Sequence, residues 1–156
     1  MRIVFLDFDG VLNSSRYIAW DEALFTSSQI DPQAVALVNE LLVRTDAKVV
    51  VSSSWRLIHT DEALSALLTE RGFTGELVGT TPRLHRTGEG IPRGRGDEIR
   101  AWLDEQRERV EGFVVLDDDD SGMRPVAEHL VLTNPTVGLL TSDLERACEL
   151  ILRAPR

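Results

Sequence analysis

The chain has 156 residues, of which 42% are hydrophobic and 28% are charged, a balance that is typical of one folded domain and excludes a disordered chain. Its net charge of −9 argues against non-specific nucleic-acid binding, and its single cysteine excludes an intrachain disulfide. No stretch approaches the roughly 18 apolar residues of a membrane span, and Asp7 and Asp9 interrupt the N-terminal apolar run too early for a signal peptide, so we expect a cytoplasmic protein without membrane contact.

The first part of the chain predicts buried strands that alternate with helices. Residues 2–7 form a short run rich in Ile, Val and Phe, which predicts a buried parallel strand. A helix is predicted over residues 31–44, because Asp31 can cap it and Pro32 suits its first turn. Residues 47–52 predict a second buried strand.

A helix, a weak strand and a long loop follow. Residues 60–71 predict a helix that ends at Gly72, and residues 76–79 predict a weak third strand. Residues 80–96 contain two prolines, four glycines and four arginines. Because long loops in compact domains are often functional, we expect this loop to contribute to a site.

The last part of the chain continues the alternation. Helices are predicted over residues 97–109 and 122–129, and strands over 113–117 and 130–133. The final helix is predicted over residues 142–153. Its Ser142 and Glu145 match a capping box, and Cys148 lies on its apolar face, where we expect a core residue rather than a reactive thiol.

Strands that alternate with helices predict an α/β fold in which helices cover both faces of a five-stranded parallel sheet. Ligands bind such sheets beyond the carboxyl ends of the strands. Three of the predicted strands end in polar residues, Asp7, Ser52 and Asp117. We therefore expect these three side chains to meet at one edge of the sheet.

Carboxylates at this edge indicate a metal site. Asp7 and Asp9 can divide the work of a nucleophile and a proton donor. Several carboxylates that converge with Asp117 repel one another unless a cation lies between them, and a small set of oxygen ligands suits Mg²⁺. The chain has no His/Cys cluster with zinc spacing.

Two charged clusters support a site for a cation and an anion together. Residues 117–120 are four consecutive aspartates, and arginines crowd the stretch from Arg83 to Arg100. The alternative from charge alone is an acidic turn and a solvated basic loop.

Three motifs resemble those of the haloacid dehalogenase (HAD) superfamily. They are FLDFDGVLNS at Asp7, VVVSSSWR at Ser52 and FVVLDDDD at Asp117, in the order and with gaps that fit the superfamily. The resemblance covers nearly the whole chain. It implies a Rossmann-like three-layer sandwich and an Mg²⁺-dependent phosphomonoester hydrolase.

The resemblance also implies residue roles. Asp7 would attack phosphorus and form an aspartyl-phosphate, while Asp9 would protonate the leaving oxygen and later deprotonate water. The carboxylates of Asp7 and Asp117 and the backbone carbonyl of Asp9 would hold Mg²⁺, with Asp118 as a further metal ligand. Ser52 would bind a phosphate oxygen.

The remaining phosphate ligands are less clearly marked. The basic residue of the third motif is either Arg93 or Arg95, and we favour Arg95 because the helix begins directly after it. Ser53 and Arg56 are further candidates for binding the phosphate, because they lie within a turn of Ser52. Arg95 as a solvated loop charge is the alternative.

The spacing between the motifs leaves no room for a separate cap domain, so residues 1–156 are expected to form one domain with a minimal cap. An open site admits phosphorylated small molecules or nucleic-acid ends, and the SSSWR and RGDEIRAWL runs are similar to HAD domains of bacterial RNA-repair proteins. The alternatives are a phosphate-binding or regulatory domain without turnover, and a small-molecule phosphotransferase. The sequence does not indicate the oligomeric state.

Overall fold

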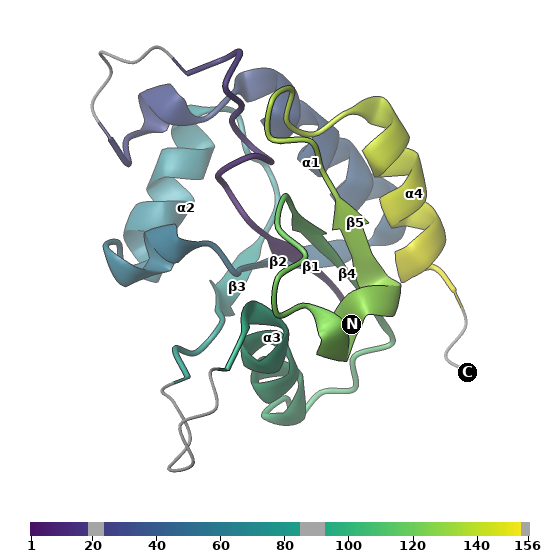
Figure 1. Cartoon of the computed structure of the whole chain (residues 1–156). Coiled ribbons are helices and arrows are strands. Elements are labelled where there is room, and N and C mark those ends of the chain that lie inside the picture. The colour runs from purple at the N-terminus through teal and green to yellow at the C-terminus, as the bar shows by residue number, and fades with distance from the viewer. Residues whose placement is uncertain (19–23, 85–92, 154–156) are drawn as a thin grey trace.

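Five parallel strands form one sheet in the order β3-β2-β1-β4-β5, which places β1 at the centre (Figure 1). The computed structural model describes residues 1–18, 24–84 and 93–153. The strands are β1 Arg2–Leu6, β2 Ala47–Val51, β3 Leu77–Thr80, β4 Gly112–Asp117 and β5 Leu130–Leu132.

Helices connect successive strands, as parallel pairing requires. None of the helices in the described ranges has the length and apolar character that crossing a bilayer demands. The α-helices are α1 Pro32–Thr45, α2 Asp61–Glu70, α3 Arg95–Asp104 and α4 Thr141–Ile151, and the short 3-10 helices are η1 Ser27–Gln29, η2 Ser54–Leu57 and η3 Arg124–His129.

The sheet separates two apolar clusters, so the fold has three layers (Figure 1). On one face, Val4 and Val49 pack with buried side chains of α1, α2 and α4. On the other face, Phe5 packs edge-to-face against Trp102 of α3, with ring centroids 5.4 Å apart. Both faces of the sheet are therefore covered, and the predicted α/β three-layer sandwich with five parallel strands is confirmed.

Most predicted elements are present, and their ends differ by a few residues. Asp31 accepts a hydrogen bond from the Gln33 N–H at 2.8 Å and so caps α1 as predicted. Cys148 is buried in the core, also as predicted. The helix predicted over residues 97–109 instead spans Arg95–Asp104.

The predicted capping box at Ser142 is wrong. Helix α4 begins one residue earlier than predicted, at Thr141. The N–H of Leu140, the residue before the helix, donates a hydrogen bond to Asp143 Oδ2 at 2.9 Å. Glu145 is engaged elsewhere, because it accepts a hydrogen bond of 2.6 Å from Arg44 of α1. The aspartate thus takes the role that the sequence pattern assigned to the glutamate.

The minimal cap remains a prediction. Between β1 and α1 the described residues contain the 3-10 helix η1, and residues 19–23 lie outside them. His85 and Arg86 of the arginine-rich stretch also lie outside the described ranges.

Candidate active site

The candidate site lies where β1, β2 and β4 end. Leu6 of β1 pairs in register with Val51 and with Leu116, so the residues that follow lie at the same level of the sheet. The Ser52 N–H donates to Leu6 O at 3.0 Å, and the Asp7 N–H donates to Leu116 O at 3.0 Å. Because β1 pairs in parallel with β2 on one side and β4 on the other, the carboxyl ends of these three strands lie together at one edge of the sheet.

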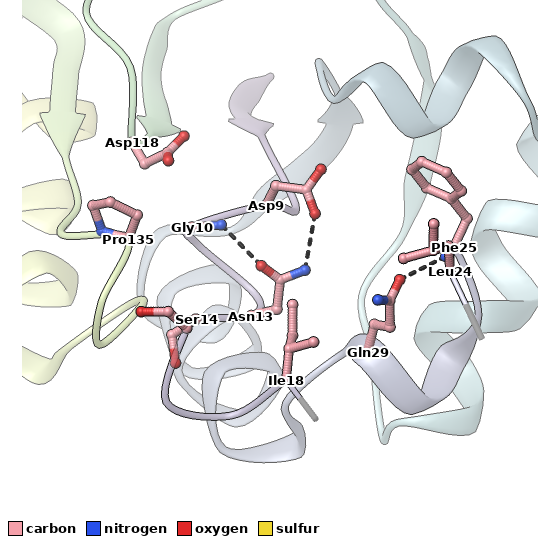
Figure 2. A pocket seen from close by; sticks show the side chains of 11 residues that line it. Asp9, Gly10, Asn13, Ser14, Ile18, Leu24, Phe25, Gln29, Asp118 and Pro135 are labelled. Atoms are coloured by element: carbon pink, nitrogen blue, oxygen red, sulfur yellow. Dashed lines mark hydrogen bonds between the residues drawn. The ribbon is translucent and has the colours of Figure 1, made fainter. Parts of the chain in front are cut away.

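Asp9 lies on the loop after β1, and two neighbours hold its carboxylate. Asn13 donates to Asp9 Oδ1 at 3.0 Å and accepts a hydrogen bond from the Gly10 N–H at 2.9 Å (Figure 2). The indole N–H of Trp55 reaches both Asp9 oxygens, at 3.3 and 3.2 Å. The Asp9 side chain is exposed, and these donors fix its direction.

Trp55 is both a core residue and a partner of the site. Its side chain is 0% exposed and packs against Phe8, with ring centroids 5.1 Å apart. The sequence favours neither packing nor function for a tryptophan after the SSS run, because the contact with Asp9 joins residues far apart in the chain. The role of Trp55 was therefore left open by the sequence.

Three carboxylates form a cluster at the sheet edge. Ligand oxygens of Asp7, Asp117 and Asp118 all lie within 4.8 Å of one another. Asp7 is 4% exposed and Asp117 is 0% exposed, so water screens their mutual repulsion poorly. Converging hard oxygen donors of this kind fit Mg²⁺, which binds carboxylates and retains water or phosphate oxygens. The position of the Asp9 backbone carbonyl as a further ligand remains a prediction.

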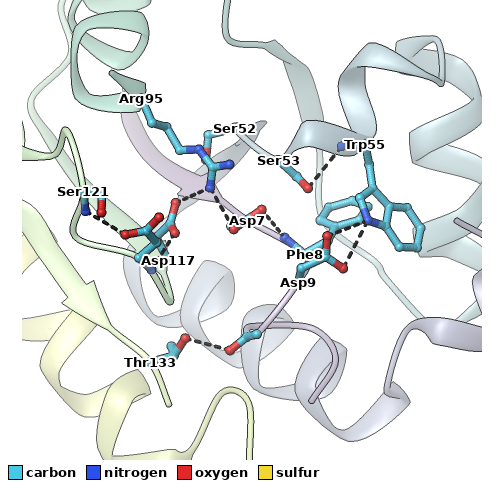
Figure 3. A network of polar contacts seen from close by, with 12 residues as sticks. Asp7, Phe8, Asp9, Ser52, Ser53, Trp55, Arg95, Asp117, Ser121 and Thr133 are labelled. Atoms are coloured by element: carbon cyan, nitrogen blue, oxygen red, sulfur yellow. Dashed lines mark hydrogen bonds and ion pairs between the residues drawn. The ribbon is translucent and has the colours of Figure 1, made fainter. Parts of the chain in front are cut away.

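Arg95, the first residue of α3, reaches this cluster. Its Nη1 donates to Asp7 Oδ2 at 2.8 Å and to Asp117 Oδ2 at 2.6 Å (Figure 3). Burial disfavours the charged guanidinium, but the two carboxylates outweigh that effect and raise the pKa of Arg95. Arg93, the other candidate for the third motif, is exposed.

Close packing of glycines places Arg95. A Cβ atom added to Gly94 would lie 2.7 Å from the Cα of Gly122, a separation that real side chains do not reach. The Gly96 N–H also donates to Gly122 O at 3.2 Å. The start of α3 therefore lies directly against the loop after β4, and this approach brings the guanidinium over the carboxylates.

Ser52 and Ser53 differ in their contacts. Ser52 is 0% exposed, and its Oγ has no hydrogen-bond partner among the described residues. Ser53 Oγ instead accepts a hydrogen bond from the Trp55 N–H at 3.3 Å and caps η2. A buried hydroxyl without a partner is costly unless a ligand or water satisfies it, which fits Ser52 as the phosphate ligand. The phosphate role of Ser53 remains a prediction.

Thr81 presents a second buried hydroxyl without a partner in the described residues. It is 3% exposed and follows β3, where its N–H donates to Val51 O at 3.0 Å. Thr81 therefore lies next to Ser52 along the same edge. Sequence reasoning missed it, because the strand before it is short and its end is not marked by an acid.

Arg56 joins three segments around the site. Its guanidinium donates to the carbonyls of Ser52 at 3.2 Å, Ser53 at 2.8 Å and Thr81 at 3.0 Å. It also pairs with Glu98 of α3 at 2.5 Å. Burial lowers the pKa of Arg56, and Glu98 offsets part of that effect. These contacts fix the backbone around Ser52 and Thr81, and a direct contact of Arg56 with phosphate remains a prediction.

Asp118 lies against the loop after β1. A Cβ atom at Gly10 would come within 2.3 Å of Asp118 Oδ2, and the φ of Gly10 is +74°, so glycine is required there on two grounds. Burial and the nearby charge of Asp7 raise the pKa of Asp118. Asp119 and Asp120 are exposed and do not belong to the cluster.

The protonation of Asp117 gives a testable pH dependence. Burial, then the charge of Asp7, raise the pKa of Asp117 from 3.8 to about 6. Between these values the folded state binds more protons than the unfolded state, so the free energy of unfolding contributed by this group falls as pH rises through that window. The asparagine side chain of Asp117→Asn does not titrate, so this variant lacks this loss. As pH rises from about 4 to about 6 in chelator, we expect its free energy of unfolding to increase relative to that of the parent by on the order of 2 kcal/mol. Urea unfolding at a series of pH values measures this difference, and a difference that is constant with pH would contradict the assignment.

Residues 3–144 match the family described as "HAD domain in Swiss Army Knife RNA repair proteins". The chain belongs to this family. A similar solved structure is the HAD domain of effector protein Lem4 from Legionella pneumophila, with a TM-score of 0.53, 17% sequence identity and 97% of each chain covered. At this identity the likeness concerns the fold alone. No curated protein matches the chain.

HAD domains are generally phosphohydrolases and typically use Mg²⁺, and this HAD domain contains the buried aspartate cluster that such chemistry needs. Membership in the family agrees with the resemblance of the three motifs. Asp7 lies between Ser52 and Asp117 at the ends of three adjacent strands, and Arg95 reaches Asp7 and Asp117 from α3, which agrees with a phosphohydrolase-like function.

Proposed function

We propose that this HAD domain is an Mg²⁺-dependent phosphomonoester hydrolase that works through an aspartyl-phosphate on Asp7. One observation carries the proposal: the nucleophile candidate lies in a buried carboxylate cluster bridged by a single guanidinium, that of Arg95. This arrangement suits a site in which a cation and a phosphoryl group are neighbours. The name of the family supports nucleotide or polynucleotide end phosphates as substrates.

The proposed steps give Asp7 and Asp9 the roles that the family resemblance implies. In the first step an Asp7 oxygen bonds to phosphorus, the bond to the leaving oxygen breaks, and Asp9 gives that oxygen a proton. In the second step Asp9 takes a proton from water, the water oxygen bonds to phosphorus, and the bond from phosphorus to Asp7 breaks. Arg95 and the Ser52 hydroxyl would bind the phosphoryl oxygens.

The carboxylate cluster would hold the cation. Asp7, Asp117 and Asp118 would be its side-chain ligands. Bound there, Mg²⁺ supplies positive charge beside the transferring phosphoryl group. Until substrate binds, Arg95 partly neutralises the same carboxylates, as its two hydrogen bonds to them indicate.

Release of phosphate from an aryl phosphate tests the proposal. We expect turnover with Mg²⁺, loss of turnover in excess chelator, and recovery when Mg²⁺ is restored. Binding of Mg²⁺ and phosphate without hydrolysis of any phosphomonoester would favour the non-catalytic alternative. Transfer to added alcohols in preference to water would favour a phosphotransferase.

The contact between Trp55 and Asp9 predicts a dependence on the leaving group. Trp55→Phe keeps the ring packing but removes the N–H that orients Asp9. Since protonation matters most for a poor leaving group, we expect kcat for an alkyl phosphate to fall about tenfold more than kcat for nitrophenyl phosphate. Trp102→Phe on the other face of the sheet is the matched control. Equal losses for both substrates would make Trp55 a packing residue only.

A further inference from the structure

A cavity of about 460 Å³ lies beside the candidate site (Figure 2). It borders Asp9 and Asp118 on one side, and Ile18, Leu24, Phe25 and Pro135 supply its apolar walls. Cavities of roughly 300–1,000 Å³ hold small organic ligands. The size of this cavity thus suits a substrate group larger than the phosphate itself.

The position of the cavity assigns it to the leaving group, an argument that rests on the proposed function. Asp9 is the residue that would protonate the leaving oxygen, and its side chain lines the cavity. Asp118 also lines it and belongs to the cluster around Asp7. The group attached to the leaving oxygen would therefore extend into this cavity, while the phosphoryl oxygens face Ser52 and Arg95.

The walls favour a group with a flat apolar face. Leu24 is 72% exposed and Phe25 is 36% exposed, although both are large apolar side chains. Exposed apolar side chains that gather at one cavity indicate a ligand that covers them. An aromatic ring such as that of Phe25 stacks on other flat rings, including nucleobases.

The lining of the cavity offers no positive charge for a second anionic group. Asp9 and Asp118 are both acidic, and the described residues that line the cavity include no lysine or arginine. Even with Asp9 protonated and Asp118 bound to the cation, these residues offer no positive side chain that would pair with a further phosphate. The cavity therefore suits a neutral group, and it disfavours a phosphodiester chain next to the scissile phosphate.

Gln29 adds a directed polar contact. It is 5% exposed, and its Oε1 accepts a hydrogen bond from the Phe25 N–H at 2.6 Å. This bond assigns the two ends of the amide and turns the nitrogen toward the side of the cavity that Ile18 lines (Figure 2). An amide nitrogen suits the acceptor atoms on the edge of a base better than it suits a plain phenyl ring.

The backbone of Phe25 supports a functional position. Its φ is 59°, a left-handed conformation that is unusual for a bulky residue. Besides the bond to Gln29, its carbonyl is bound by His59 Nε2 at 3.0 Å, and its ring lies 5.4 Å from that of Trp55. Such conformations persist where surrounding contacts enforce them, and they concentrate at ligand sites.

We propose that this cavity binds the nucleoside of a nucleoside monophosphate, so that single nucleotides are preferred over sugar phosphates and over phosphorylated polynucleotides. A flat neutral base would lie against Leu24 and Phe25, and its edge would bond Gln29. The single phosphate would lie at Asp7.

Steady-state kinetics with Mg²⁺ test this assignment. The substrates are acetyl phosphate, adenosine and uridine 5′-monophosphates, glucose 6-phosphate, phosphotyrosine and a 5′-phosphorylated tetranucleotide. We expect kcat/KM for the nucleotides to exceed that for glucose 6-phosphate by about 10–200-fold. Leu24→Ser should lower kcat/KM for the nucleotides about tenfold more than for acetyl phosphate, mainly through KM. Leu152→Ser is the control, because Leu152 is 50% exposed after α4.

The outcomes separate the two proposals. If acetyl phosphate and every other substrate remain intact, the proposed hydrolase is wrong. If acetyl phosphate is hydrolysed but glucose 6-phosphate, phosphotyrosine or the tetranucleotide equals or exceeds the nucleotides, the nucleoside assignment is wrong. An equal effect of Leu24→Ser on acetyl phosphate and on the nucleotides would likewise overturn it.

Discussion

Asp7→Asn is expected to abolish phosphate release, with a loss of kcat of roughly 10⁴-fold or more, because no other described side chain can take its place as the nucleophile. Asn lacks the negative charge that attacks phosphorus, and it is a weaker ligand for the cation. The substitution leaves the shape of the side chain almost unchanged. The loss is measured as release of inorganic phosphate from an aryl phosphate with Mg²⁺ in excess.

A matched control is available in the same acidic region. Asp120→Asn also removes one negative charge, but Asp120 is exposed and outside the carboxylate cluster. We expect its activity to remain within about twofold of the parent, since surface substitutions of this kind are usually nearly neutral. Wild-type activity in the Asp7→Asn protein would remove the basis of the mechanism. Thermal melts of both variants separate a chemical loss from unfolding.

Arg95→Met is expected to lower kcat/KM by about 10²–10³-fold, because a preorganised donor to the phosphoryl oxygens is lost. It should also lower the free energy of unfolding of the metal-free protein by on the order of 3 kcal/mol, since the buried carboxylates of Asp7 and Asp117 lose their counter-charge. Because Mg²⁺ replaces that charge, we expect Mg²⁺ to restore much of the stability and little of the activity. Urea unfolding with and without Mg²⁺, together with steady-state kinetics, measures both effects.

Arg93→Met is the control for this prediction. Arg93 lies two residues before Arg95 and is exposed, so its removal should change neither stability nor kcat/KM beyond about twofold. A large loss in Arg93→Met and none in Arg95→Met would assign the third motif to the other arginine. A stability deficit in Arg95→Met that Mg²⁺ does not reduce would contradict a cation site shared with the guanidinium.

The positions of Asp7, Ser52 and Asp117 could be predicted because they depend on one rule of sheet geometry. The apolar runs predict parallel strands, and parallel strands end at one edge. The three-layer arrangement follows from the same alternation of elements, whereas the strand order β3-β2-β1-β4-β5 needed the structure. Local patterns were sufficient for this part of the fold.

The choice between Arg93 and Arg95 needed the structure. It depends on the contact between Gly94 and Gly122, which joins two loops that sequence periodicity does not relate. The pairing of Arg56 with Glu98 of α3 has the same origin. The capping box failed for a different reason, because Thr141, Ser142 and Asp143 are all good capping residues and only packing selects among them.

The central place of β1 has a consequence for the synthesis of the chain. Arg2 pairs with Ala47 on one side and with Gly112 on the other, so β1 is synthesised well before β4, the strand that covers its second edge. Until β4 emerges, the apolar edge of β1 faces solvent or a chaperone, and nascent chains of this kind fold slowly and are exposed to aggregation. Because Asp117 ends β4, a truncated chain that stops before β4 would lack both the enclosing strand and the proposed metal ligand.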